Sequence, residues 1–158
     1  MKEIQLTQGK IALVDDGDFE SVTRFKWHVS SENYAETTSY IGSVGGQHKY
    51  AYMSMHRLIM RPPEGMEVDH RHHNTLDCRR SKMRICTKSQ NQHNQLKQKG
   101  SSKFKGVSWH KRATKWMVKL QNDGKAIHLG YFHDEETAAR AYDDKARELF
   151  GEFAHTNF

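Results

Sequence analysis

Asp69 and His70 stand side by side in a histidine-rich segment, residues 68–95, and are the residues whose chemistry is most specific. A carboxylate is a hard oxygen ligand for a divalent ion, and an imidazole has a pKa suited to taking a proton from water. The pair therefore predicts a metal ion beside a general base. By itself the dipeptide is a weak signal, because most Asp-His pairs are ordinary loop residues.

Zinc is an alternative ion for this segment, whose zinc-capable side chains are Cys78, Cys86, His70, His72, His73 and His93. Structural zinc sites usually combine two closely spaced ligand pairs, and neither cysteine has a second cysteine near it. Structural zinc is therefore disfavoured, and Cys86 is predicted to be a small buried residue. Two cysteines are too few for a disulfide framework, so we expect reduced thiols.

The net charge of +6 is unevenly distributed along the chain. Residues 79–125 carry 14 basic residues and one acidic residue, Asp123, whereas both flanking segments are net negative. A solvated surface explains a short run of charges. A run of this length, with Trp, Phe and His interleaved, favours a polyanion such as double-stranded DNA.

The length of 158 residues suits one domain or two small ones. No stretch of about 18 apolar residues is present, and the polar start lacks the apolar core of a signal peptide, so neither a membrane span nor secretion is expected. We expect a cytoplasmic protein with no small-molecule substrate.

The elements that position the Asp-His pair are predicted to be mainly short antiparallel strands. In chain order we predict two strands around a turn at residues 8–9, an acidic turn at residues 15–18, strands around residues 25–29 and 50–54, a glycine-rich turn at residues 42–46, an apolar run at residues 55–60, a short strand that ends at His70, and a polar helix at residues 89–97.

The pattern changes after residue 103, where three strands and a helix are predicted. The first two strands are residues 104–110 and 115–121. An Asp-Gly hairpin turn leads to the third strand, in which Ile127, Leu129 and Tyr131 are predicted to point inward. An amphipathic helix follows, capped by Asp134 and closed by Gly151. The helix covers one face of the sheet and leaves the other, polar and basic, free.

Several motifs of this C-terminal segment recur in order in a known family: Lys105-Gly106-Val107, Lys115-Trp116, Leu129-Gly130 with Phe132, residues 138–143, and Asn157-Phe158. Nearly all of residues 102–158 thereby resembles the plant Apetala/ethylene-response-factor (ERF) DNA-binding domain. The resemblance implies a sheet docked in the major groove, with Trp116 at a packing position. Its DNA-contacting positions fall on Lys105, Gly106, Ser108, His110, Lys119, Gln121, Ala126 and His128. Because four of these replace arginines and a tryptophan of the family, only phosphate contacts are expected to be shared.

The histidine-rich segment has its own ordered frame, which is Val68-Asp69-His70, Asn74-Thr75-Leu76-Asp77, Arg79-Arg80-Ser81, residues 84–87 and Gln90-Asn91. The frame resembles the HNH homing-endonuclease family of phage and intron type, and residues 55–60 resemble the strand that precedes it there. The resemblance implies a two-strand-plus-helix unit around one metal ion (ββα-metal). His70 would be the general base, and Asp69 and Asn91 the ligands of Mg²⁺ or Mn²⁺.

One position departs from the family. Lys82 stands at the position of the family's middle asparagine, which ties down the loop that carries the general base. The catalytic positions implied by the resemblance are therefore His70, Lys82 and Asn91. A lysine side chain accepts no hydrogen bond, and its charge disfavours a nearby cation. Arg79 and Arg80 are predicted DNA contacts.

Together these observations predict an α+β protein. Residues 1–97 form a small β-rich HNH nuclease domain, residues 98–102 a linker, and residues 103–158 an ERF-like domain with a three-stranded antiparallel sheet backed by one helix. The predicted function is a metal-dependent DNA endonuclease that nicks one strand as a monomer, leaving a 3′ hydroxyl and a 5′ phosphate. The alternatives are a DNA-binding regulator with a degenerate nuclease site and a zinc-stapled nucleic-acid binder.

Overall fold

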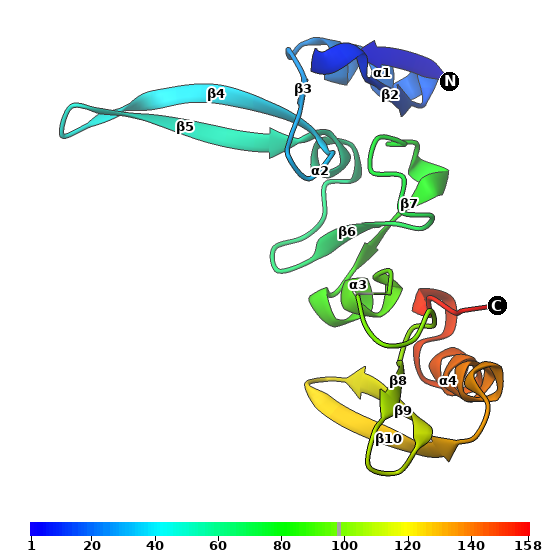
Figure 1. The fold of residues 1–158 in the computed structure, drawn as a ribbon. Coiled ribbons are helices and arrows are strands. Elements are labelled where there is room, and N and C mark those ends of the chain that lie inside the picture. Colours follow the sequence, from blue (N-terminus) through cyan, green and yellow to red (C-terminus); the bar gives the residue numbers. More distant parts are fainter. Residues whose placement is uncertain (98) are drawn as a thin grey trace. The chain divides into compact units, whose positions relative to one another are not determined.

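The computed structural model describes residues 1–97 and 99–158. The packing divides the chain into two compact units, Met1–Cys86 and Thr87–Phe158 (Figure 1). Gln98, the first residue of the predicted linker, lies outside the described residues. The structural division falls before the predicted boundary at residue 97, because the polar helix expected at the end of the nuclease domain packs within the second unit.

The first unit consists of short elements joined by turns. In chain order they are β1 (Lys2–Gln5), the 3-10 turn η1 (Thr7–Gly9), β2 (Ile11–Val14), α1 (Asp16–Thr23), β3 (His28–Val29), β4 (Ala35–Val44), β5 (Gln47–Ser54), α2 (Met55–Met60), β6 (Glu67–His70), the 3-10 turn η2 (Arg80–Lys82) and β7 (Met83–Cys86). The strands pair antiparallel as β1-β2, β3-β4-β5 and β6-β7. The predicted pair around residues 8–9 and the strand ending at His70 are confirmed.

Fully buried apolar side chains from three of these elements, Val14, Val22 and Met55, hold the first unit together. Met55 begins α2, and α2 packs against both β6 and β7. This packing places α2 beside the hairpin that carries Asp69 and His70.

Two predictions at the start of this unit are wrong. The acidic residues 15–18 begin a helix, since Asp15 takes the N-cap position and Asp16 and Asp18 lie in the first turn, where carboxylates favour the helix dipole. The period-two pattern of residues 25–29 yields only the two-residue strand β3. The first residues of this pattern instead pack against the end of α1, because the Phe25 N–H and the indole N–H of Trp27 both donate to the carbonyl of Val22.

The apolar run at residues 55–60 is also not a strand. It forms α2, which begins after Ser54 and ends at Arg61, whose positive φ of 47° turns the chain. His56 is therefore a helix residue, and this changes which side chains it meets.

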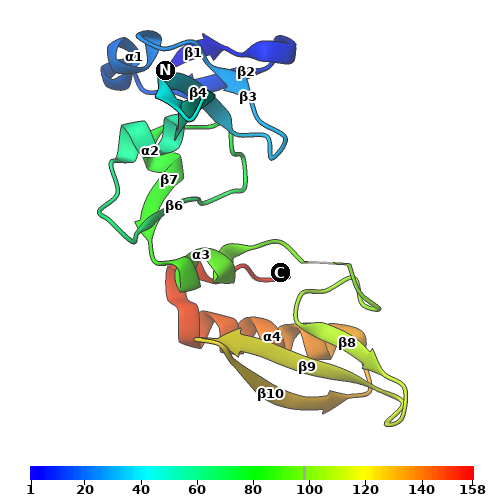
Figure 2. The ribbon, with the colours of Figure 1, turned by 90° about the vertical axis from the view of Figure 1, so that its left-hand side faces the viewer.

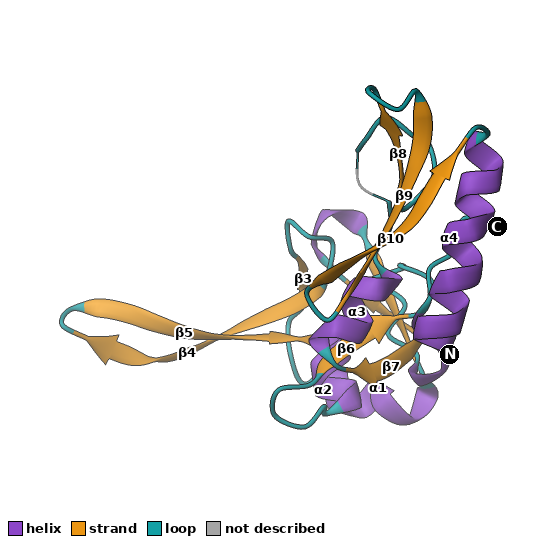
Figure 3. Ribbon diagram, turned by 90° about the horizontal axis from the view of Figure 1, so that it is seen from below, coloured by secondary structure: helices purple, strands orange, loops and turns teal. Residues whose placement is uncertain are grey.

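The β4-β5 hairpin projects beyond the rest of its unit (Figures 1 and 3). Its turn is Gly45-Gly46, with φ of 60° and 78°, the two-residue geometry that suits the twist of a hairpin. Gly42 lies within β4, beside an irregularity in the register, so the predicted turn at residues 42–46 is shorter than expected. We call the exposed part of this hairpin, residues 38–52, the β4-β5 arm.

The second unit has the predicted sheet and helix. Its elements are α3 (Lys88–Asn94), β8 (Val107–His110), β9 (Lys115–Asn122), β10 (Lys125–Phe132), α4 (Glu135–Phe150) and the 3-10 turn η3 (Gly151–Phe153). The antiparallel sheet has the order β10-β9-β8, and α4 lies along one face of it (Figure 2). The hairpin turn at Asp123-Gly124 and the Asp134 cap, which accepts from the Thr137 N–H at 2.7 Å, are as predicted.

Tyr131 does not point inward as predicted. The register of β10 shifts between His128 and Gly130, and the extra residue places Tyr131 opposite Met117, on the face away from α4. Its ring contacts the rings of His110 and His128, with centroids 5.1 and 4.9 Å away. Tyr131 therefore belongs to the exposed sheet face.

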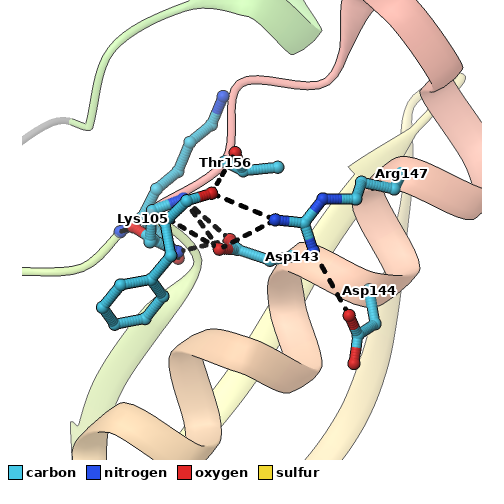
Figure 4. A network of polar contacts seen from close by, with 7 residues as sticks. Lys105, Asp143, Asp144, Arg147 and Thr156 are labelled. Atoms are coloured by element: carbon cyan, nitrogen blue, oxygen red, sulfur yellow. Dashed lines mark hydrogen bonds and ion pairs between the residues drawn. The ribbon is translucent and has the colours of Figure 1, made fainter.

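The last residues close the second unit through a polar network around Asp143, part of which is drawn in Figure 4. Asp143 is 1% exposed and accepts hydrogen bonds from the backbone N–H groups of Asn157 and Phe158. The Asn157 amide in turn pairs with the backbone of Lys105, at 2.6 and 3.2 Å. The Asn157-Phe158 motif thus acts in folding. Across the described ranges, no helix combines the length and apolarity that crossing a membrane requires.

Candidate functional site

Asp69 and His70 lie at the end of β6 and face opposite sides of the β6-β7 hairpin. Asp69 is paired with Arg84 across the hairpin and His70 with Met83. Because consecutive strand residues point to opposite faces, the adjacent carboxylate and imidazole have different surroundings.

The Asp69 carboxylate forms a buried ion pair with Arg84. The guanidinium Nε donates to Asp69 Oδ2 at 2.7 Å, and Nη2 lies 2.7 Å from the same oxygen. The residues are 4% and 7% exposed. Arg84 belongs to the HNH-like sequence frame, but no role was predicted for it. A correct register for the β6-β7 hairpin would have revealed the pair, since the two residues stand directly opposite each other.

His70 packs in a cluster with Tyr34 and His56, two residues from other parts of the unit. The centroid of the His70 ring lies 5.8 Å from that of Tyr34 and 5.3 Å from that of His56, and the latter two are 5.1 Å apart. Burial lowers the pKa of His70 below its usual value, although the charges of Asp69 and Asp77 oppose this shift. The imidazole is therefore neutral at neutral pH, the form that can accept a proton.

His56 is the most strongly perturbed member of this Tyr34-His56-His70 cluster. Burial, with smaller contributions from His70 and Arg57, lowers its pKa to about 3. Its Nε2 lies 3.2 Å from Ser54 Oγ, and its Nδ1 is buried with no hydrogen-bond partner within the described residues. His56 is thus a neutral ring packed against the candidate base. No sequence signal had pointed to Tyr34.

The loop after His70 is tied down by backbone hydrogen bonds. The Arg71 N–H donates to the Lys82 carbonyl at 2.9 Å, and the His73 N–H donates to the His70 carbonyl at 3.0 Å. Any residue at position 82 can supply the first bond. The lysine therefore leaves a backbone tether of this loop intact, whatever its side chain does.

The Asn74–Asp77 part of the frame anchors the same loop to the rest of the unit. The Leu13 N–H donates to the Leu76 carbonyl at 2.9 Å, and the Cys78 N–H donates to the Leu13 carbonyl at 2.8 Å. Thr75 and Asn33 exchange two further hydrogen bonds. These residues position the loop and take no part in chemistry that the structure shows.

Arg79 and Arg80, both predicted to contact DNA, are engaged within their own unit. Arg79 binds Asp77 through two hydrogen bonds and lowers the pKa of that carboxyl. Arg80 binds Asp18 at 2.7 and 2.8 Å and also donates to the Ile59 carbonyl. Both guanidinium groups thus hold loops of the first unit together, and their contact with DNA stays a prediction.

The zinc-capable residues do not converge in the described part of the chain. In residues 1–97 and 99–158 no group of three or more His, Cys, Asp or Glu side chains could hold a metal ion. Cys78 and Cys86 are fully buried, and burial raises the pKa of their thiols to about 12 and 11. His93 stacks on Phe150 at 3.5 Å between centroids. Cys86 is buried, as predicted.

Asn91, the other predicted metal ligand, lies on α3 in the second unit. Thr87 and Gln90 form a capping box at the start of this helix, and Ser89 Oγ donates to Asp123 Oδ1 at 2.9 Å. The Lys105 ammonium donates to the carbonyls of residues 93 and 95 at the other end. The helix that the HNH resemblance includes is thus built into the unit that contains the exposed sheet.

The sheet face opposite α4 gathers most of the predicted DNA-contacting positions. Strand pairing places on this face Ser108, His110, Met117, Lys119, Gln121, Ala126, His128 and Tyr131. Tyr131 was predicted on the opposite face. Lys119, Gln121 and His128 are exposed, so this face offers hydrogen-bond donors to a ligand.

Lys105 and Gly106, both predicted to contact DNA, have structural roles in the second unit. Burial lowers the pKa of Lys105 to about 8, and its ammonium is occupied by the end of α3. Gly106 has a φ of +75°, and a Cβ there would lie 2.0 Å from the ring of Tyr142. Only glycine fits this backbone position. Trp116 packs against the core, as predicted.

The residues that would hold a divalent ion are hard oxygen donors, which suit Mg²⁺ or Mn²⁺. Mg²⁺ sites commonly use one or two protein ligands and complete the shell with water and substrate phosphate, so few protein donors suffice. The type of donor therefore fits a divalent ion, whereas the Arg84 guanidinium already neutralises the Asp69 carboxylate and opposes the binding of a second cation there.

Comparison with known proteins bears on the same segment. Residues 56–93 match the HNH endonuclease family. The match includes the β6-β7 hairpin, His56, His70 and Asn91. An uncharacterized HNH endonuclease of Acanthamoeba polyphaga mimivirus is 28% identical over 162 residues, covering 95% of this chain and 76% of the relative.

The C-terminal segment has different relatives, from plants. APETALA2-like protein 2 of Oryza sativa subsp. indica is 40% identical over 58 residues, and an AP2-like ethylene-responsive transcription factor of Arabidopsis thaliana is 38% identical over the same length. Each match covers 37% of this chain but only 13% and 12% of the plant proteins. The comparisons support a nuclease and, for the C-terminal segment, DNA binding.

Proposed function

We propose that this protein is a metal-dependent DNA endonuclease of HNH homing type, which hydrolyses phosphodiester bonds and nicks one strand as a monomer. The observation that carries the proposal is the position of His70. It ends β6 within the segment that matches the HNH family, and two aromatic rings hold its imidazole.

In this proposal His70 accepts the proton of the water that attacks phosphorus. Packing against Tyr34 and His56 restricts the ring, and the Arg71–Lys82 backbone bond holds the loop behind it. Asp69 and, on sequence grounds, Asn91 are the oxygen donors for Mg²⁺ or Mn²⁺. Bound there, the ion would offset charge on the phosphate and the departing oxygen.

The C-terminal unit keeps the protein on duplex DNA in this proposal. The exposed sheet face would enter the major groove, with Lys119, Gln121 and His128 donating hydrogen bonds. We propose the ββα-metal arrangement, a phage or mobile-element origin and action in the host cytoplasm as parts of the same hypothesis.

Two observations favour a second function, a DNA-binding regulator with an inactive nuclease site. Asp69 is paired with a buried arginine, and Lys82 replaces the expected asparagine. The Arg84 guanidinium places a positive charge at the carboxylate that would bind the cation, and a lysine at position 82 adds positive charge to the segment, so both disfavour the ion.

A plasmid nicking assay tests the proposal. Wild-type protein with Mg²⁺ or Mn²⁺ should convert supercoiled DNA to the open circular form, and His70→Ala should lower the rate at least ~100-fold, the usual contribution of a general base. His72→Ala is the matched control, because His72 is an exposed histidine two residues away. Intact plasmid with both ions, and no difference between wild type and His70→Ala, would refute the endonuclease.

Lys82→Asn separates the two functions. If the wild type is inactive and Lys82→Asn cleaves DNA, the regulator with a decayed site is supported. Strong cleavage by the wild type that Lys82→Asn leaves unchanged excludes decay at this position.

A further inference from the structure

The β4-β5 arm is an exposed feature of the first unit that the proposed function does not use. Its large side chains are open to solvent, with Tyr40, Tyr50 and Tyr52 exposed by 58%, 48% and 74% and Ile41 and Val44 by 62% and 63%. In Figure 3 its two strands run together away from the rest of the unit. Such a ribbon, with nothing packed on it in this unit, has a geometry suited to contact with another molecule.

One face of the arm is lined by hydrogen-bonding side chains. Strand pairing sets Tyr40 opposite Tyr50, Thr38 opposite Tyr52 and Ser43 opposite His48, so that the members of each pair share a face. Tyr40 also contacts His48 and Tyr50, with ring centroids 5.5 and 5.8 Å away. We call these residues the tyrosine face. Hydroxyl and imidazole groups of this kind donate to phosphate oxygens and base edges.

The charge of the arm distinguishes it from the rest of its unit. The first unit contains 11 acidic residues, and none lies between residues 37 and 54. The arm carries Lys49, which is exposed, and His48. A surface without carboxylates can approach a polyanion, whereas the remaining surface of this unit carries the acidic residues.

The arm is continuous with the candidate active site. Tyr34 directly precedes β4 and His56 follows β5, and both rings contact His70. The strands therefore leave the unit from the cluster that holds the candidate base. A substrate whose phosphate is positioned at His70 must also pass the base of the arm.

We propose that the β4-β5 arm binds duplex DNA next to the cleaved phosphodiester, with the tyrosine face toward the DNA. This inference rests on the proposed endonuclease function and names a second contact with its substrate. The major groove, about 12 Å wide, admits a two-stranded ribbon. A second copy of the chain is the other candidate occupant, but the donor-rich tyrosine face and the absence of acidic residues favour DNA.

The experiment measures binding separately from cleavage. In a His70→Ala background, binding to a labelled duplex is followed by fluorescence anisotropy and nuclease footprinting. One variant replaces residues 40–50 by Asn-Gly, which joins Ser39 to Ala51, a cross-strand pair, by a tight turn. We expect its Kd to rise at least ~10-fold and its footprint to shorten on one side of the cut.

Tyr52→Ala is the second variant, because this residue of the tyrosine face is 74% exposed and its substitution leaves folding intact. Losing its hydrogen bond to the DNA should raise the Kd by about 3–10-fold. Val44→Ala is the matched control, because Val44 is exposed but follows Ser43 in the strand and so lies on the opposite face of the arm, and it should leave the Kd unchanged. Thermal unfolding of each variant reports folding.

An unchanged footprint and an unchanged Kd in both arm variants would overturn the inference, even if the wild type nicks DNA. A dimer in sedimentation that the shortened arm converts to a monomer, with no loss of DNA affinity, would overturn it in favour of a second copy. The proposed endonuclease function is tested separately, because it fails only if the wild type does not nick plasmid DNA.

Discussion

The buried His56 should make the first unit lose stability in acid. Its pKa is about 3 in the folded protein against 6.5 for an ordinary histidine, because burial disfavours the charged ring. Between these values the unfolded chain binds a proton that the folded chain does not. The free energy of unfolding is therefore highest above pH 6.5 and falls as the pH falls toward 3. Between pH 7 and pH 4 this single histidine should remove about 3 kcal/mol.

Urea unfolding at a series of pH values measures this effect. Trp27 belongs to the core of the first unit, so its fluorescence reports that unit once Trp109 and Trp116 are replaced by Phe. His56→Gln cannot bind the proton and should show a pH dependence that is weaker by about 3 kcal/mol over this range. His72→Gln, at an exposed histidine, should keep the wild-type dependence.

The comparison uses the pH dependence and not the absolute stability, because replacing a buried ring also changes packing. If His56→Gln and the wild type lose the same free energy between pH 7 and pH 4, then His56 is protonated in the folded protein. The buried neutral ring beside His70 would then be refuted.

Three further substitutions test the packing that positions the site and the sheet. Arg84→Met leaves the buried Asp69 carboxylate without its counter-ion, and urea unfolding should show a loss of about 3–5 kcal/mol in the first unit. Gly106→Ala forces a Cβ against the ring of Tyr142, at a positive φ, and thermal unfolding of the second unit should show a loss of about 2 kcal/mol or more. Asn157→Ala removes the pairing of its side chain with the backbone of residue 105, and should cost the same unit about 1–3 kcal/mol by urea unfolding. An unchanged midpoint in any of them would contradict the contact concerned.

Local patterns predicted the second unit well. Alternation, an Asp-Gly turn and a helix capped by Asp134 are short-range signals, and each determines a conformation largely without help from distant residues. Tyr131 is the exception, because one bulge residue reverses the facing of everything after it.

Local patterns were less informative in the first unit. The apolar run that begins at Met55 is compatible with a strand or a short helix, and its packing against β6 and β7 selects the helix. The period-two pattern at Phe25 and Trp27 likewise does not form a strand, because both residues donate hydrogen bonds to the Val22 carbonyl at the end of α1. Tertiary contacts override weak propensity in such short elements.

The amino-acid sequence by itself determined the chemistry that this protein can offer: an Asp-His pair, an asparagine in the matching frame and a basic middle segment. Residue types and spacing along the chain are enough for such a conclusion. Only the tertiary structure decided what surrounds those groups. It paired Asp69 with Arg84, packed Tyr34 and His56 against His70, and joined Arg80 to Asp18. Burial and charge pairing depend on residues distant in sequence, and these set whether a side chain is a base, a ligand or part of the scaffold.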